Sequence, residues 1–125
     1  MVKADIRVTI ELKDGSTVVF GSGLCSDESE ISKGLSHKMQ GNMFFEFSDG
    51  LKLRHPDEKV IFNTKDMLFT IDIAVYDRDG NFIFGMEKAA PGIKRIVLPE
   101  NVTFVFEMDS RFPYSLLGSK LISYG

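Results

Sequence analysis

The sequence lacks tryptophan, has a single cysteine and contains no long run of apolar residues. One cysteine, Cys25, cannot form a disulfide within the chain, which excludes a disulfide-stapled secreted miniprotein. No segment approaches the roughly 18 consecutive apolar residues of a membrane-spanning helix. The first residues run into a charged, alternating segment with no apolar stretch that resembles a signal sequence. These absences predict a cytoplasmic protein without a membrane partner.

An excess of positive charge and a set of metal ligands are missing too. Fifteen basic residues against eighteen acidic ones give a formal net charge of −3. That balance argues against nucleic acid or an anionic membrane surface as the main partner. Two histidines, His37 and His55, lie far from each other and from Cys25, and they form no metal-ligand spacing. Because no nucleotide motif is present either, we expect no metal, no cofactor and no nucleic acid.

The sequence does contain enough apolar residues for one folded domain. It is 43% hydrophobic and 26% charged, close to the average of soluble globular proteins. A chain of 125 residues should bury roughly two-thirds of its unfolded surface, which is enough for a core without staples. No linker, repeat or low-complexity tract divides it, so residues 1–125 are expected to form a single domain.

Alternation with a period of two dominates the chain. Polar and apolar residues alternate from Asp5 to Leu12, which predicts a strand with one buried face and one solvent face. Lys13-Asp14-Gly15 predicts a three-residue loop with Gly15 in the left-handed conformation, which would place Ile10 opposite Val18. A two-residue loop would move Val18 to the polar face.

Further strand patterns recur at intervals of about ten residues, separated by Gly and Asp turns. They cover residues 43–47, 59–63, 68–77, 82–86, 93–98, 102–108 and 120–124. A short helix is expected after the first hairpin. Residues 26–30 supply capping and acidic first-turn residues, and Ile31, Leu35 and Met39 follow at a spacing of four. Residues 112–117 fit one further helical turn.

These elements together predict the fold class. We expect a mostly β domain, α+β at the margin, built as one curved or barrel-like antiparallel sheet with one short inserted helix.

Two acids are expected to face each other across a hairpin. If Asp79-Gly80 forms a two-residue turn, Val75 pairs with Phe84, and Asp72 lies opposite Glu87 on the other face. Opposed acids repel unless a cation or a shared proton relieves them. The pattern therefore fits a ligand-facing acid pair, but it also fits a solvated strand face with Lys65 or Lys88 nearby.

A polar interruption precedes this hairpin. Asn63-Thr64-Lys65-Asp66 separates two apolar strands with four hydrogen-bonding side chains, and functional groups concentrate on such loops. We hypothesise that Lys65, Asp66, Asp72 and Glu87 form one polar, ligand-binding patch at the mouth of the β structure. The alternative is a solvated turn in which Asp66 caps its own backbone.

The order of these motifs resembles an uncharacterised prokaryotic family, domain of unknown function number 192. Its Arg-Gly-Leu-Met element, its central signature with an Asp-Gly hairpin and its closing strand correspond to residues 33–36, 62–80 and 104–108. Lys65, Asp72 and Glu107 are retained, whereas Asn63, Asp66, Met67 and Thr70 replace the family's Trp, Asn, Thr and Pro. The resemblance implies a compact β-rich fold with short helices and no established reaction.

Three functions remain open from the sequence. The first is a non-enzymatic module that binds a small polar ligand or a protein. The second is a hydrolase or lyase that uses Asp72 with Glu87 or Glu107 as paired carboxylates. The third is a structural or assembly role through exposed strand edges. The sequence identifies neither the partner nor the oligomeric state.

Overall fold

The computed structural model describes residues 3–25, 41–47 and 61–125. These ranges contain nine strands and no helix. The strands are β1 (Lys3–Glu11), β2 (Thr17–Cys25), β3 (Met43–Glu46), β4 (Ile61–Phe62), β5 (Ile71–Tyr76), β6 (Phe82–Ala89), β7 (Ile96–Val97), β8 (Phe104–Asp109) and β9 (Lys120–Tyr124). The helix expected after the first hairpin lies outside the described residues. Within them, no helix is long and apolar enough to span a bilayer.

Seven strands form one sheet in the order β6-β5-β8-β3-β2-β1-β9, and β4 pairs with β7 in a second, two-stranded sheet. The expectation of a purely antiparallel sheet is wrong at one place, because β3 runs parallel to β2. Parallel neighbours need a crossover of a dozen or more residues. The chain between Cys25 and Met43 is long enough to provide one.

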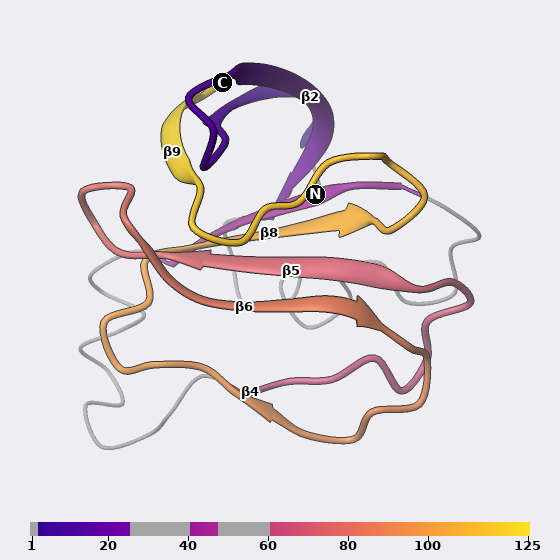
Figure 1. Cartoon of the computed structure of the whole chain (residues 1–125). Coiled ribbons are helices and arrows are strands. Elements are labelled where there is room, and N and C mark those ends of the chain that lie inside the picture. Colours follow the sequence, from indigo (N-terminus) through magenta and orange to yellow (C-terminus); the bar gives the residue numbers. More distant parts are fainter. Residues whose placement is uncertain (1–2, 26–40, 48–60) are drawn as a thin grey trace.

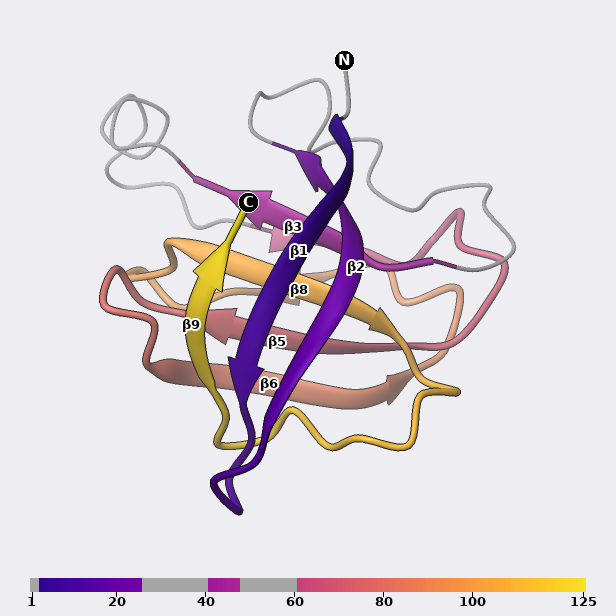
Figure 2. The same cartoon turned by 90° about the horizontal axis from the view of Figure 1, so that it is seen from above.

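The large sheet is strongly curved but does not close into a barrel. Its curvature carries β1, β2 and β9 across the strands β5, β6 and β8, as Figure 2 shows. The two outer strands approach at a single isolated bridge, Asn81 with Lys120, and form no ladder in the described chain. The barrel-like closure expected from the sequence is therefore absent, whereas the curvature is present.

The central strands lie between two hydrophobic cores. All six residues of β5 are buried. Ile73 and Val75 face the core shared with β4 and β7, while Ala74 and Tyr76 face the core under β1 and β2. The small sheet and the β1-β2-β9 layer thus cover opposite sides of the central strands (Figure 1). A strand covered on both faces must bury every side chain that it carries.

The register of the first hairpin is confirmed. Ile10 pairs with Val18, the Leu12 N–H donates to the Ser16 carbonyl at 2.7 Å, and Gly15 has a φ of +90°. This is the three-residue loop with a left-handed glycine that the apolar pattern required.

The second hairpin reaches its predicted register by a different route. Val75 pairs with Phe84 as expected, but the two-residue turn is wrong. The Asp77 N–H donates to the Asn81 carbonyl at 2.9 Å, which closes a three-residue loop. The Asp77 carboxylate stabilises this loop by accepting the Asn81 N–H at 2.9 Å as well. An irregularity between the pairings of Val75 and Tyr76 then restores the register.

Residues 110–119 form an irregular segment, here called the strap, in place of the expected helical turn. Pro113 disfavours a helical conformation at the preceding Phe112. Leu116 is buried in the core beneath β1 and β2. The Ser119 hydroxyl donates to the Leu116 carbonyl at 2.6 Å and is hydrogen-bonded to the Tyr76 hydroxyl at 2.6 Å. The far end of the strap is thereby fixed to the sheet.

The two hairpin glycines make a matched test of the fold. Gly15 and Gly80 both have positive φ, but a Cβ at Gly15 would meet open space, whereas one at Gly80 would overlap the Leu121 carbonyl oxygen. Gly15→Ala should cost about 1 to 2 kcal/mol from its left-handed backbone. Gly80→Ala should cost roughly 1 to 3 kcal/mol more from steric overlap. Urea unfolding of both variants measures the difference, and equal costs would contradict the close approach of the hairpin to β9.

Candidate functional site

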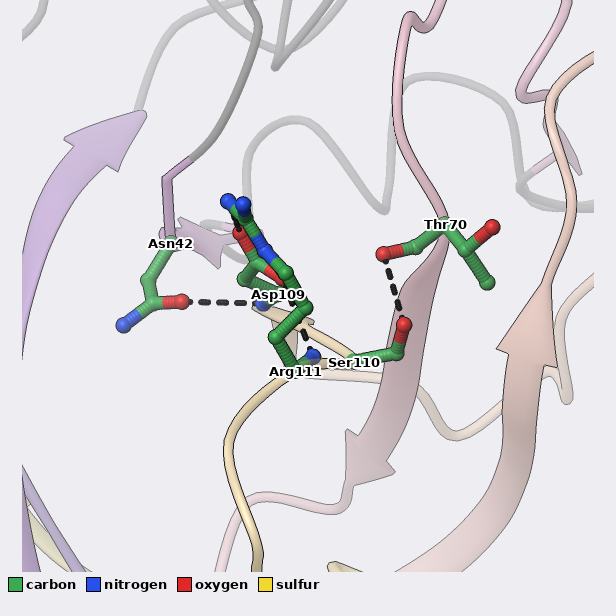
Figure 3. Close-up of polar contacts among 5 residues, drawn as sticks. All are labelled: Asn42, Thr70, Asp109, Ser110 and Arg111. Atoms are coloured by element: carbon green, nitrogen blue, oxygen red, sulfur yellow. Dashed lines mark hydrogen bonds and ion pairs between the residues drawn. The ribbon is translucent and has the colours of Figure 1, made fainter.

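The large sheet divides at one end, where the Asn42 side chain fills the gap. β2 pairs with β3 only from Gly23 onward. Before that point the Asn42 amide donates to the Gly21 carbonyl at 3.1 Å and accepts the Asp109 backbone N–H at 3.0 Å. Figure 3 shows Asn42 pointing at Asp109. A side-chain amide has the same donor and acceptor as a peptide group, so Asn42 connects β2 to β8 as a strand would.

An ion pair lies next to this bridge. Oδ1 of Asp109 accepts the backbone N–H and the Nε–H of Arg111, both at 3.0 Å, and Oδ2 lies 2.6 Å from an Arg111 terminal nitrogen. The Asp109 side chain is 6% exposed and that of Arg111 66% exposed. The hydrogen bonds from the Arg111 side chain lower the pKa of Asp109, although burial acts in the opposite direction. Asp109 is thus a buried carboxylate that holds an exposed guanidinium in place.

Ser110 fixes the beginning of the strap to the beginning of β5. Its hydroxyl and its backbone N–H both donate to the Thr70 carbonyl, at 3.0 and 3.1 Å (Figure 3). The ends of β3, β5 and β8 therefore meet around Asp109.

A surface pocket of about 460 Å³ opens at this junction. It is lined by Gly21, Gly41, Asn42, Asp109, Arg111, Phe112 and Pro113. Phe112 is 44% exposed, and its ring packs edge-on against that of Phe20, with 6.1 Å between the ring centroids. The described lining residues combine a fixed guanidinium with apolar surface, and none of them is a serine, cysteine or histidine. Such a lining is suited to binding an anionic group on an apolar body.

Asp72 and Glu87 are neighbours, as predicted, but not as a simple opposed pair. Ile73 pairs with Met86 and Ile71 with Ala89, so Glu87 and Lys88 together oppose Asp72. This β-bulge places Lys88 at a φ of +53° and directs its N–H to the Asp72 carboxylate at 2.8 Å. Burial raises the pKa of Asp72, and the charge of Glu87 raises it further.

The other two predicted site residues belong to a turn and not to a strand. Lys65 and Asp66 are exposed in the turn after β4, and no contact in the described structure joins their side chains to Asp72 or Glu87. Asn63, not Asp66, caps this turn, because its side chain accepts the Lys65 N–H at 3.1 Å. The ligand-binding patch of Lys65, Asp66, Asp72 and Glu87 stays a prediction.

Thr64, in the same turn, has a structural role. Its hydroxyl donates to the Ala90 carbonyl at 2.6 Å and accepts the Ile93 N–H at 2.9 Å. The side chain is buried, so one of the four polar residues in this turn serves to hold residues 90–93.

The alternative acid pair, Asp72 with Glu107, is excluded by the register. Ile73 pairs with Glu107 and Asp72 with Met108, and side chains of paired residues share a face. The two acids consequently lie on opposite faces of the sheet. Glu107 is 3% exposed, and within the described chain no hydrogen bond or ion pair reaches its carboxyl group. Burial raises its pKa to about 8.

The sequence-based reasoning missed Asn42, Asp109 and Arg111. The sequence did contain a signal for two of them, because three polar residues, Asp109-Ser110-Arg111, directly follow an apolar strand. No such signal marked Asn42, because its partner Asp109 is 67 positions away. The described residues contain no group of three or more acids, histidines or cysteines suited to a metal ion.

Comparisons with known proteins identify the fold. No family model and no curated protein sequence matches the chain, so the resemblance to domain of unknown function number 192 stays a prediction. A solved structure from Sinorhizobium meliloti, described as a putative transcription regulator, is 23% identical in sequence and superposes with a TM-score of 0.78; the match covers 98% of this chain and 96% of that protein. A protein of unknown function from Novosphingobium aromaticivorans is 20% identical, with a TM-score of 0.75; the match covers 94% of this chain and 84% of that protein. The chain shares the fold of both.

Glu107 generates a prediction about pH. Its pKa of about 8 lies above the ordinary glutamate value of 4.5, so the unfolded chain releases this proton first as the pH rises. Below pH 4.5, Glu107 makes its full contribution to the free energy of unfolding. Between pH 4.5 and 8 this contribution falls by about 1.4 kcal/mol per pH unit. In urea unfolding, Glu107→Gln should remove this decline, whereas the same change at exposed Glu100 should not. A wild-type slope unchanged by Glu107→Gln would contradict the neutral, buried carboxyl.

Proposed function

We propose that the protein is a non-catalytic binding module whose ligand brings a carboxylate, or a similar anionic group, to Arg111. The observation that carries this proposal is the combination of fixation and exposure in one side chain. The guanidinium of Arg111 is held at two nitrogens by Asp109, yet its side chain is 66% exposed beside the pocket. Planar guanidinium groups recognise carboxylates with high geometric specificity.

The fixation lowers the entropic cost of binding. A free surface arginine loses rotamer freedom when it orders around a ligand, about 0.5 to 1.5 kcal/mol for a side chain of this kind. Arg111 is ordered before a ligand binds, because its partner Asp109 is buried and the backbone N–H of Asp109 donates to Asn42. The Asp109 charge also reduces the net attraction for an anion, so affinity must come in part from apolar contact.

Phe112 and Pro113 supply that contact. Both line the pocket, and the edge-on packing of Phe112 on Phe20 restricts the ring. An anionic group joined to an aromatic or branched apolar body would satisfy both parts of the lining. Binding is supported better than catalysis, because Asp72 accepts the Lys88 N–H and Glu87 accepts the Ser115 hydroxyl at 2.7 Å. Both acids thus already have hydrogen-bond partners within the fold.

The test uses phenylacetate as a probe and its neutral amide, phenylacetamide, as a control. Phenylacetate should shift the backbone NMR signals of Gly21, Asn42 and Arg111 in a saturable manner, and the amide should do so much more weakly. Arg111→Gln should weaken phenylacetate binding by about tenfold or more, since a hydrogen bond to a charged group contributes about 1.5 to 3 kcal/mol. Arg95→Gln removes an equal charge from an exposed site outside the pocket lining and should leave binding unchanged.

A second variant guards against loss of folding. Arg111→Gln removes the ion-pair partner of the buried Asp109 carboxylate, which destabilises the fold. The double variant Asp109→Asn with Arg111→Gln removes both charges and should fold yet fail to bind phenylacetate. Equal binding by wild type and the double variant would refute the proposal.

A further inference from the structure

The first half of β2 has a backbone edge that points away from β1. The N–H and the carbonyl of Arg7 both bond to Gly125, at 3.2 and 3.0 Å, so they face β9. Gly21, the partner of Arg7 on β2, therefore belongs to a non-hydrogen-bonded pair, and its carbonyl faces outward to Asn42. Because the direction alternates along a strand, the backbone groups of Thr17 and Val19 face outward as well.

No described strand occupies this edge. β3 joins β2 only from Gly23 onward, and between Thr17 and Gly21 the Asn42 amide is the single described group that bonds to the outward side. Val19 is 57% exposed, and a Cβ added to Gly21 would meet nothing within 4 Å. Gly21 also lines the pocket beside Arg111, so the open edge and the pocket are continuous.

This edge also lacks the usual protection against strand addition. Exposed edges are normally blunted by bulges, prolines or charged side chains. The ladder of β6 with β5 has irregularities near both of its ends. By contrast, residues 17–21 pair with β1 without a register shift and contain neither proline nor a charged residue.

Building on the function proposed above, we propose that the ligand is an extended peptide that adds to Thr17–Gly21 as a β-strand and places a carboxylate at Arg111. The outward N–H and carbonyl of Val19 and the N–H of Gly21 provide main-chain hydrogen bonds. The exposed Arg7 side chain, opposite Gly21 in the register, adds a second positive charge at the end nearest the pocket. A neighbouring apolar residue of the peptide would meet Phe112 and Pro113.

Val19 offers a sharp test, because its N–H is not part of the β1–β2 ladder. Val19→Pro removes one outward donor at a position where an edge strand tolerates proline, and Val19→Thr keeps the donor and the branched shape. Random ten-residue peptides displayed on phage would be selected on the intact chain, and the winners synthesised. Val19→Pro should weaken these peptides about fivefold to tenfold and Val19→Thr less than twofold, as expected for one main-chain hydrogen bond.

Two further measurements keep the inference falsifiable if Val19→Pro does not fold. Hydrogen exchange of the wild-type chain should be fast at Val19 and Gly21 and slow at Phe20, whose N–H faces β1, and a selected peptide should slow the first two. Backbone nitrogens of the bound peptide point alternately toward β2 and away from it. Methylation of those that face β2 should abolish binding, whereas methylation of the others should leave binding unchanged.

The outcomes separate this inference from the proposed function. Peptides that are sensitive to the Asp109→Asn/Arg111→Gln double variant but not to Val19→Pro would overturn strand addition and leave the carboxylate pocket standing. A selection that yields no binder would overturn strand addition as well. Concentration-dependent dimerisation of the free chain that Val19→Pro abolishes would assign the edge to a second copy and overturn the peptide.

Discussion

The structure depends on one constraint, which is that β5 and β8 are covered on both faces. Each polar side chain on these strands must either find a partner at a strand end or stay buried and neutral. Asp72 finds the backbone N–H of a β-bulge, and Asp109 finds Arg111 on the strap. Glu107 lies in the middle of its strand, where no described residue offers it a hydrogen bond or an ion pair, and burial raises its pKa to about 8. Whether each acid is paired or held neutral thus follows from its position along the strand.

The same coverage explains why the candidate site lies at a strand end. The layer of β1, β2 and β9 belongs to the same sheet as the central strands but crosses them, so it is not hydrogen-bonded to them along its whole length. The sheet divides where β2 leaves β3, and the Asn42 amide maintains the connection to β8. A pocket and an open backbone edge are both consequences of that division. Main-chain donors, an ordered guanidinium and apolar rings come together there. Among the lining residues that the structure describes, none has a side chain suited to covalent chemistry.

Order within this site comes from several short contacts. Ser110 ties the strap to β5, Phe112 rests on Phe20, and Ser119 ties the far end of the strap to Tyr76. Each bond is modest, about 1 kcal/mol, but together they fix both ends of the segment that carries Arg111. A binding surface ordered in this way loses little conformational entropy when a ligand arrives.

The sequence by itself determined the local features. The alternation from residue 5 to 12 and the position of Gly15 were sufficient for the first hairpin, because only one loop length keeps Val18 on the buried face. The last strand, Lys120–Tyr124, has the bounds that its pattern predicted. Tertiary structure decided the rest. The parallel β3, the bulge that gives Lys88 to Asp72, and the bridge from Asn42 to Asp109 join residues between 16 and 67 positions apart. Such contacts depend on which strands become neighbours, and no local period in the sequence encodes that choice.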